Sequence, residues 1–450
     1  MLCFDMYQGQ VLIGRQQSKR MDFHPSERSR LWLQKAHAFF ERYLLPHNGA
    51  WHQSVADRVY PPPFLADLKA LAKDEGLWNL CLPGLPTSAP GTRLSNLEYA
   101  PIAELLGRLP WASEVFNCQA PDSGNMELLL RYANEAQSKR WLQPLLQGQI
   151  RSAFAMSEPD VASSDPANLQ TALRREGDTL VLQGRKWFIT GAAHPDCRLL
   201  IVMCRDLDLA GRADTDPHRQ HSLVLVPIDA PGVHTLRNIP VLHHVAPEGH
   251  CEILLQGVRL GPESLLGQTG TAFAMAQARL GPGRLHHGMR SIGQCELALQ
   301  LACARVRERE AFGRHMSAFS NVQDWIAHSR VAIDQARLLL LQTAWRLDQP
   351  DSDPQQLRSD VAAVKLVAAQ LQTQVVDRAI QMFGAMGLSP DTPLAYFWSW
   401  GRAMHLMDGP DEVHLRSIAR HALRQSAEQG ASLAAYFTTP EQLKTPPQIR

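Results

Sequence analysis

The hydrophobic period of this 450-residue chain changes twice, and these changes limit the folds that the chain can adopt. From residue 26 to about residue 148, apolar side chains recur every three or four positions, as on one face of a helix. Between residues 153 and 267, short alternating runs are separated by turn residues, which is typical of antiparallel strands. The helical spacing then returns and continues to about residue 430. The sequence therefore predicts helices, then a compact β domain, then a bundle of long helices.

This pattern divides the chain into five segments. We expect the N-terminal α-helical domain at 26–152, the central β domain at 153–267 and the C-terminal helical bundle at 268–430. Residues 1–25 are interpreted as an extension that is either disordered or a mis-assigned start, because a further methionine, Met21, stands shortly before the first helix. Residues 431–450 are rich in proline, glutamine and threonine, so a loosely ordered tail is expected there.

Composition argues against several classes of protein. The formal net charge is +1, from 45 basic and 44 acidic side chains, which argues against a nucleic-acid binder. The eight cysteines are scattered without a paired spacing, which indicates reduced thiols and a cytoplasmic protein. The longest apolar run, Leu199 to Cys204, is too short to span a membrane. The chain has no His-Glu-x-x-His motif or cysteine cluster, so we expect no metal site.

Two neighbouring segments of the β domain combine short hydroxyls with aromatic rings. The first runs from Phe154 to Asp165 and must turn at its Ser-Glu-Pro step, and the second runs from Lys186 to Gly191. Such groups suit a flat ligand that forms hydrogen bonds, although a Ser/Pro-rich turn beside a core aromatic would explain them equally well. The candidate ligand-binding residues here are Phe154, Met156, Ser157, Ser163, Phe188, Ile189 and Thr190.

Three further motifs lie at predicted helix ends, and each has a purely structural explanation. Arg309-Glu-Ala-Phe-Gly313 has the composition of a helix stop, and Gln381-Met-Phe-Gly-Ala-Met-Gly387 that of a glycine C-cap. In Met407-Asp-Gly-Pro-Asp-Glu-Val413, a helix start would use Gly409 as N-cap and Pro410 as the first helical residue.

Taken together, these motifs resemble those of the acyl-CoA dehydrogenases, in the same order along the chain. The first two segments resemble the flavin-contacting segments of that family, and the helix-end motifs resemble its Arg-x-x-Phe-Gly, Gln-x-Phe-Gly-Gly-x-Gly and Glu-Gly-Thr segments. The turn Asp-Gly-Pro-Asp-Glu is similar to that of the long-chain-type branch. The resemblance covers about residues 26–430. It implies an α+β multidomain fold, with an N-terminal helical domain, a central antiparallel β-barrel domain and a C-terminal four-helix bundle.

The resemblance also implies roles for individual residues. Asp408 would be the base that removes the α-proton of a thioester, and Arg284 would position it. Contacts to the cofactor, FAD, would come from the seven β-domain residues above together with Arg309, Phe312, Gln381, Gly384, Ala385, Pro410 and Glu412. Of these, Arg309 and Phe312 would contact the FAD of a neighbouring subunit. Contacts to the substrate would come from Ser163, Gly281, Pro282, Gly283, Arg284 and Gly409.

The implied activity is α,β-desaturation of an acyl-CoA thioester, with hydride transfer from Cβ to the flavin. The implied partners are an acyl-CoA substrate, an electron-transfer flavoprotein and further copies of the chain in a homodimer or homotetramer. Asp408 is one methylene shorter than the usual Glu, Pro410 replaces a Thr and Phe188 a Trp. Burial is expected to raise the pKa of Asp408 toward neutrality.

Three other functions fit the same motifs. One is a flavoprotein oxidase of the nitroalkane-oxidase type, which also uses an Asp base and which reaction with oxygen would reveal. A second is an enzyme that remodels hydroxyacyl-CoA thioesters. The third is a non-enzymatic acyl-CoA-binding protein, against which the carboxylate of Asp408 argues.

Overall fold

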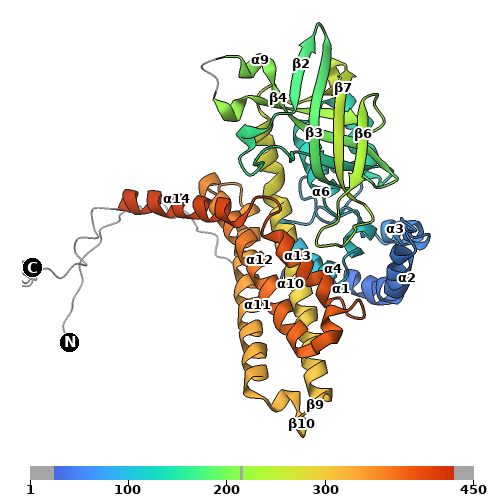
Figure 1. Cartoon of the computed structure of the whole chain (residues 1–450), viewed down its shortest axis with the longest axis vertical. Helices are drawn as coiled ribbons and strands as arrows, with labels where there is room; N and C mark the ends of the chain where they lie inside the picture. Colours follow the sequence, from blue (N-terminus) through green and yellow to red (C-terminus); the bar gives the residue numbers. More distant parts are fainter. Residues whose placement is uncertain (1–24, 213–215, 430–450) are drawn as a thin grey trace, which may run out of the picture.

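The computed structural model describes residues 25–212 and 216–429 (Figure 1). Helices come first, a sheet follows, and long helices end the described chain, so the predicted order of the three parts is confirmed. The predicted tail and all but the last residue of the predicted extension lie outside the described residues. No helix in the described part of the chain is both long enough and apolar enough to span a lipid bilayer.

The N-terminal part consists of short helices, and two of them continue directly through a π-helical turn into the next helix. Their bounds are α1 Glu27–Phe39, a π-helical turn Phe40–Leu44, α2 Leu45–Ala56, α3 Phe64–Asp74, α4 Asn96–Gly107, α5 Ala112–Val115, α6 Asp122–Tyr132, α7 Glu135–Gln137, a π-helical turn Ser138–Leu142 and α8 Gln143–Leu146. The Ser26 hydroxyl caps α1 by accepting from the Ser29 N–H, as its sequence position predicts. Ser95 and Glu98 form a capping box at α4.

The middle part is one sheet of eight strands. Their bounds are β1 Arg151–Ala155, β2 Ala172–Glu176, β3 Thr179–Thr190, β4 Cys197–Asp206, β5 His221–Pro227, β6 Val233–Asn238, β7 His250–Leu260 and β8 Leu265–Leu266, with the short helix α9 Leu207–Ala210 after β4. The order is β6-β7-β3-β2-β4-β5-β8, with β1 beside β4. Pairing is antiparallel except for β1 with β4 and β2 with β4. The central domain is thus the mainly antiparallel β domain that was expected, and among the described residues no pairing joins its end strands β6 and β8.

The C-terminal part is built around the long helix α10, Ala272–Glu308. It packs with α11 Ser320–Leu347, α12 Pro354–Phe383 and α13 Leu394–Met404, whereas α14 Asp411–Gln429 packs on α12. The hairpin of β9 Glu310–Ala311 and β10 Arg314–His315 follows α10. The other face of α10 lies against α4 (Figure 1). A Cβ added at Gly107 would collide with the Arg290 carbonyl, and one at Gly293 with the Glu104 carbonyl. These two glycines let the backbones of α4 and α10 touch, which fixes the N-terminal part against the bundle.

Two helix boundaries differ from the sequence interpretation. α14 begins at Asp411, so Pro410 precedes the helix and Gly409 is not its N-cap. α10 ends at Glu308, and Phe312 and Gly313, with φ of 50° and 73°, form the turn of the β9–β10 hairpin. Two consecutive positive φ values are typical of the tight turns that suit the twist of a hairpin. Gly313 therefore closes a hairpin rather than a helix.

A buried ion pair joins the two candidate ligand-binding segments of the sheet. The Lys186 side chain is 0% exposed, and its ammonium donates to Glu158 Oε1 at 2.8 Å, to the Met156 carbonyl at 2.9 Å and to the Met203 carbonyl at 2.7 Å. Glu158 also accepts from the backbone N–H groups of Gln170 and Thr171. All three ammonium donors are therefore used, which is the condition under which a buried charge is tolerated.

Replacing Lys186 tests whether this pair supports the fold. Lys186→Met leaves the Glu158 carboxylate buried without its counter-charge, so we expect the free energy of unfolding to fall by about 3–5 kcal/mol in urea titrations. Lys139→Met makes the same chemical change at an exposed site and should leave stability unchanged. Equal stability of the two variants would contradict the structural role of the pair.

Candidate functional site

Asp408 lies in the turn between α13 and α14, and its backbone is held there from two sides. Its φ is 54°, a left-handed value that aspartate adopts more readily than most residues. Its carbonyl oxygen accepts from Arg284 Nε at 2.9 Å and from His414 Nε2 at 3.3 Å. Within the described residues the Asp408 N–H has no acceptor. The turn therefore presents the free N–H of Asp408 beside its carboxylate, while the Asp408 carbonyl is held by two hydrogen bonds.

Asp411 closes the same turn from its other end. Its N–H donates to the His405 carbonyl at 3.1 Å, and its carboxylate accepts from His405 Nδ1 at 2.5 Å. The ammonium of Lys365, a buried residue of α12, lies 3.4 Å from the other carboxylate oxygen. Asp411 is thus occupied in holding the backbone, which leaves Asp408 as the carboxylate available for chemistry.

Basic groups surround the Asp408 side chain, 27% of which is exposed. Burial by itself raises the pKa of Asp408, but the electrostatic influence of the neighbouring His287 and the positive charges of Arg284, Arg279 and Lys365 outweigh it, so the pKa is lowered from its usual value. The expectation of a pKa near neutrality is therefore wrong for the protein without ligands. The physical reason is that two helices, α10 and α12, bring cations to one carboxylate.

Sequence reasoning did not select Arg279, which connects Asp408 with the sheet and with α6. Its guanidinium Nε donates to Asn125 Oδ1 at 2.8 Å, and its guanidinium carbon lies 4.3 Å from the ring centre of Phe154 on β1. Burial lowers the pKa of Arg279 to about 10, which leaves it charged at neutral pH. The predicted residue Phe154 is thereby placed beside the Asp408 site.

Sequence reasoning did not select His287, Lys365 or Asn125 as residues of this site. One signal was present, because α10 contains Arg279, Arg284 and Arg290 but no acidic residue before Glu296. Basic residues in a long helix without acidic neighbours at helical spacing indicate partners elsewhere in the fold. No comparable signal marks Lys365 or Asn125.

The two candidate segments of the sheet are brought together as predicted. The Trp187 N–H donates to the Ser157 carbonyl at 3.0 Å. The Ser163 hydroxyl accepts from the Glu158 N–H at 2.9 Å, so it stabilises its own loop. These contacts shape the loop, and they leave Ser163 with less capacity for a ligand than its sequence position suggested.

The second segment reaches the bundle through Thr190. The Thr190 hydroxyl lies 2.9 Å from His250 Nδ1, and the His250 ring lies 6.1 Å from that of Trp400 on α13. The Ile189 side chain is buried in the core of the sheet, so only its backbone can meet a ligand. Phe188 is 43% exposed and has a φ of 52°, an outlying conformation for a bulky residue.

The remaining predicted residues fall into two places. α10 continues through Pro282, and the turn of this helix that directly precedes Arg284 contains Gly281, Pro282 and Gly283. Five exposed residues lie at the end of the bundle where α10 and α12 terminate, and they are Arg309, Phe312, Gln381, Gly384 and Ala385. The two helix ends are close together there, since the guanidinium carbon of Arg305 is 5.7 Å from the Phe383 ring centre. Figure 1 shows β9 and β10 at this end, away from the sheet. Within one chain, these five residues therefore do not lie at the same site as Asp408.

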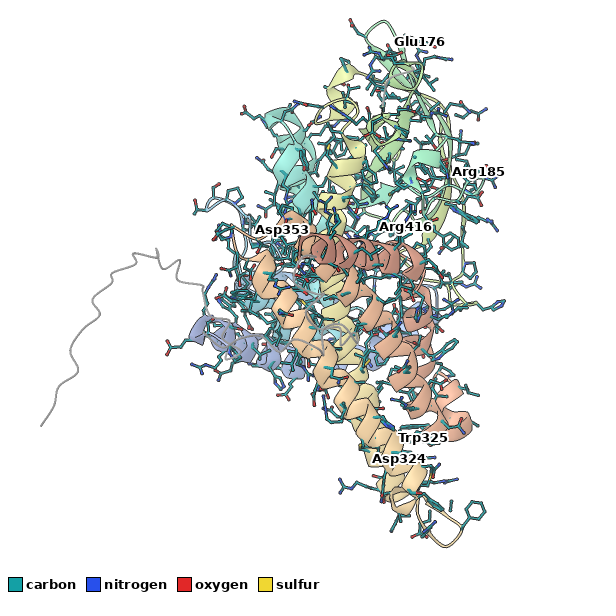
Figure 2. All side chains as sticks on the ribbon, turned by 90° about the vertical axis from the view of Figure 1, so that its left-hand side faces the viewer. Glu176, Arg185, Asp324, Trp325, Asp353 and Arg416 are labelled. Atoms are coloured by element: carbon teal, nitrogen blue, oxygen red, sulfur yellow. The ribbon has the colours of Figure 1, made fainter. Side chains whose placement is uncertain are left out.

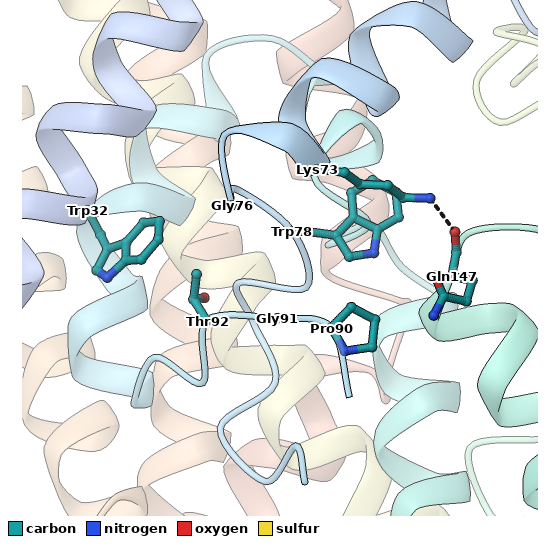
Figure 3. A pocket seen from close by; sticks show the side chains of 8 residues that line it. All are labelled: Trp32, Lys73, Gly76, Trp78, Pro90, Gly91, Thr92 and Gln147. Atoms are coloured by element: carbon teal, nitrogen blue, oxygen red, sulfur yellow. Dashed lines mark hydrogen bonds between the residues drawn. The ribbon is translucent and has the colours of Figure 1, made fainter. Parts of the chain in front are cut away.

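A separate cavity of about 520 Å³ lies in the N-terminal helical part (Figure 3). Trp32 and Trp78 line opposite sides of it, and the Lys73 ammonium donates to the Gln147 carbonyl at 2.5 Å. None of the predicted site residues is among the residues that line it. The residues around Asp408 are therefore the better candidate for chemistry.

The exposed groups fit the parts of a flavin dinucleotide. Phe188 and Trp187 offer aromatic rings whose centres are 5.0 Å apart, beside the backbone groups of the first segment. Arg309 is exposed, and its side chain has no partner in the part of the chain that the structure describes. A free guanidinium suits a pyrophosphate.

The position of Gly409 leads to a test of the turn. Its φ is 98°, and a Cβ there would lie 3.1 Å from His414 Nε2, so Gly409→Ala is expected to lower the free energy of unfolding by about 1–3 kcal/mol. Gly283→Ala is the matched control: its Cβ would meet no atom within 4 Å, and a helical alanine should stabilise by about 0.5–1 kcal/mol. Thermal unfolding of both variants measures the difference in stability. A Gly409→Ala variant as stable as the wild type would show that this position does not require glycine.

Comparison with known proteins agrees with this architecture. Family models of the acyl-CoA dehydrogenase N-terminal, middle and C-terminal domains match residues 26–149, 153–258 and 270–423. The Mycobacterium tuberculosis protein named "Probable acyl-CoA dehydrogenase FadE2" is 51% identical over 83% of this chain and 88% of its own length. Human acyl-CoA dehydrogenase family member 11 is 41% identical over 88% of this chain, which spans only 50% of that longer protein.

Solved structures give the same result. A protein of Mycobacterium abscessus assigned to the acyl-CoA dehydrogenases superposes with a TM-score of 0.84 at 42% identity, over 90% of this chain and all of its own. Butyryl-CoA dehydrogenase of Megasphaera elsdenii, at 23% identity and a TM-score of 0.74, covers 90% of this chain and all of its own and shares the fold. The chain therefore belongs to the acyl-CoA dehydrogenase family of oxidoreductases.

Proposed function

We propose that this protein desaturates an acyl-CoA thioester between Cα and Cβ, with Asp408 as the base that removes the α-proton. The observation that supports this most is the Asp408 turn, which combines a partly exposed carboxylate, a free backbone N–H and a tethered carbonyl. The proposal adds the reaction and its residues to the family membership established above.

The charges around Asp408 prepare it to accept a proton. A base must be ionised before it can act, and the cations of Arg279, Arg284 and Lys365 favour the carboxylate form. The α-proton of a thioester is a weak acid, so the negative charge that develops on the thioester oxygen also needs stabilisation. The free Asp408 N–H is a suitable donor for that oxygen. Arg284 fixes the direction of this peptide by holding its carbonyl.

The cofactor that we propose is FAD, which when bound supplies the acceptor for the hydride from Cβ. Phe154, Ser157, Phe188 and Thr190 would hold its ring system, because they lie on the loop and strand that meet the bundle. Pro410 and Glu412, at the start of α14, would border it from the other side. The buried pair of Lys186 and Glu158 would keep this loop in place without touching the cofactor.

The substrate would approach along α10. Gly281 and Gly283 leave open space next to Arg284, where a Cβ would meet no atom within 4 Å. Glycine at these positions lets a thioester come close to the helix backbone. Gly409 would border the same space from the Asp408 turn.

Arg309 and Phe312 support an oligomer. The Phe312 side chain is 97% exposed at the tip of the β9–β10 hairpin, where a large apolar ring costs free energy in water. We propose that the far end of the bundle meets a second copy and that Arg309 there contacts the pyrophosphate of its FAD. An electron-transfer flavoprotein is the electron acceptor that we expect, in a cytoplasmic reaction.

The first experiment is anaerobic titration of the flavin-loaded protein with acyl-CoA thioesters of different chain lengths, followed by flavin absorbance. Asp408→Asn should retain flavin but lose bleaching by more than about 10³-fold, because the base cannot accept a proton. Asp67→Asn makes the same change at an exposed site on α3 and should bleach normally. Bleaching by Asp408→Asn would refute the assignment. Reduction by nitroalkanes with rapid oxygen reaction would indicate an oxidase instead.

A second experiment tests the proposed oligomer. Arg309→Ala should weaken FAD binding by about tenfold, since a charge-assisted hydrogen bond is lost, and Phe312→Ser should shift the mass measured by light scattering toward the monomer. Arg416→Ala removes an exposed arginine from α14 and serves as control (Figure 2). Unchanged flavin affinity and unchanged mass would exclude this end of the bundle as an interface.

A further inference from the structure

His287 on α10 faces the Asp408 carboxylate. Its Nε2 lies 3.8 Å from Asp408 Oδ2, and 25% of the His287 side chain is exposed. Within the described residues it is the only basic side chain whose nitrogen lies within 4.0 Å of this carboxylate. The preceding residue, His286, is buried and packs against Tyr99, with ring centres 5.1 Å apart. The two adjacent histidines therefore have different environments.

The contact with Arg290 fixes which nitrogen of His287 carries the proton. Arg290 Nη2 lies 3.2 Å from His287 Nδ1, and a guanidinium can only donate hydrogen bonds. His287 Nδ1 must therefore accept, which places the ring proton on Nε2. Burial, with the positive charge of Arg290, lowers the pKa of His287 to about 4, so the ring is neutral near pH 7. The nitrogen that lies 3.8 Å from Asp408 Oδ2 therefore carries the proton of a neutral ring.

We propose that His287 is a positioning residue for the base: its Nε2–H holds Asp408 Oδ2 and stabilises the ionised carboxylate, which leaves Oδ1 to accept the substrate proton. This inference rests on the proposed function of Asp408. The distance of 3.8 Å exceeds that of a hydrogen bond, and such contacts in sites without ligand often shorten once the substrate is bound. A neutral donor suits this role, because it orients the carboxylate without forming an ion pair.

Other charged groups face Asp408 but are engaged elsewhere. From α10, the Arg279 Nε donates to Asn125 and the Arg284 Nε donates to the Asp408 carbonyl. From α12, Lys365 pairs with Asp411. From α14, His414 also meets the Asp408 carbonyl, and burial lowers its pKa to about 4. These groups act on the carboxylate through charge at a distance, whereas His287 alone is placed to select one of its two oxygens.

The test is the pH dependence of flavin reduction by an acyl-CoA that bleaches the wild-type holoenzyme. Asp408 accepts the proton only when ionised, so the rate falls as the pH drops through its pKa. His287→Leu removes the donor that favours the ionised form of Asp408, so the fall of the rate on the acidic side of the pH profile, its acidic limb, should move to higher pH. At pH values on this acidic side the rate should be about tenfold lower than in the wild type. Above the limb the rate should change little.

Matched variants separate positioning from packing. His287→Gln keeps a neutral N–H donor and should restore the wild-type limb. His286→Gln changes the neighbouring buried histidine and should not move it. A loss of rate in His287→Leu that is equal at every pH, or an unchanged profile, would overturn the proposal.

A second measurement is independent of turnover. Protein labelled with ¹³C at the aspartate side-chain carboxyl can be titrated by NMR, with Asp408→Asn used to assign the Asp408 signal. We expect its midpoint at higher pH in His287→Leu than in wild type, and an identical midpoint would overturn the proposal. If no acyl-CoA reduces the wild-type flavin, the proposed function fails, while this titration still decides the contact between His287 and Asp408.

Discussion

The ammonium group of Lys186 sits in the interior of the sheet and connects three separate parts of the chain. It bonds to Glu158 and Met156 in the first loop and to Met203 on β4, while Lys186 itself belongs to β3. Breaking these bonds would expose a buried charge to an apolar interior, which is costly. The loop that we assign to the cofactor consequently has one favoured conformation, and its hydroxyl and aromatic groups are arranged before any ligand binds.

The helix α10 relates this loop to the turn that contains Asp408. It touches α4 through glycines, so its axis is fixed against the N-terminal part, and it continues past Pro282 despite the lost hydrogen bond there. From this fixed axis it directs Arg279 toward Phe154 on the sheet, and Arg284 and His287 toward Asp408. One rigid element thus sets the position of the carboxylate relative to the sheet.

The electrostatics of the site follow from that arrangement. A carboxylate with cations nearby stays ionised despite burial, at the expense of some basicity. A thioester and a flavin would exclude water from the same space and strengthen every charge interaction there. In the proposed reaction, the balance between these two effects would set the pKa at which Asp408 works as the base.

Local patterns in the sequence determined the order of helices and strands, the glycine stop of α12 at Gly384 and the motifs that mark the family, because periodicity and turn chemistry act within a few residues. The approach of Arg279, His287 and Lys365 to Asp408 was decided only by the tertiary structure. These residues are separated from Asp408 by 43 to 129 positions, and no local rule links them. For the same reason the lowered pKa of Asp408 could not be predicted. It depends on how the helices pack, which is set by the shape of the whole core.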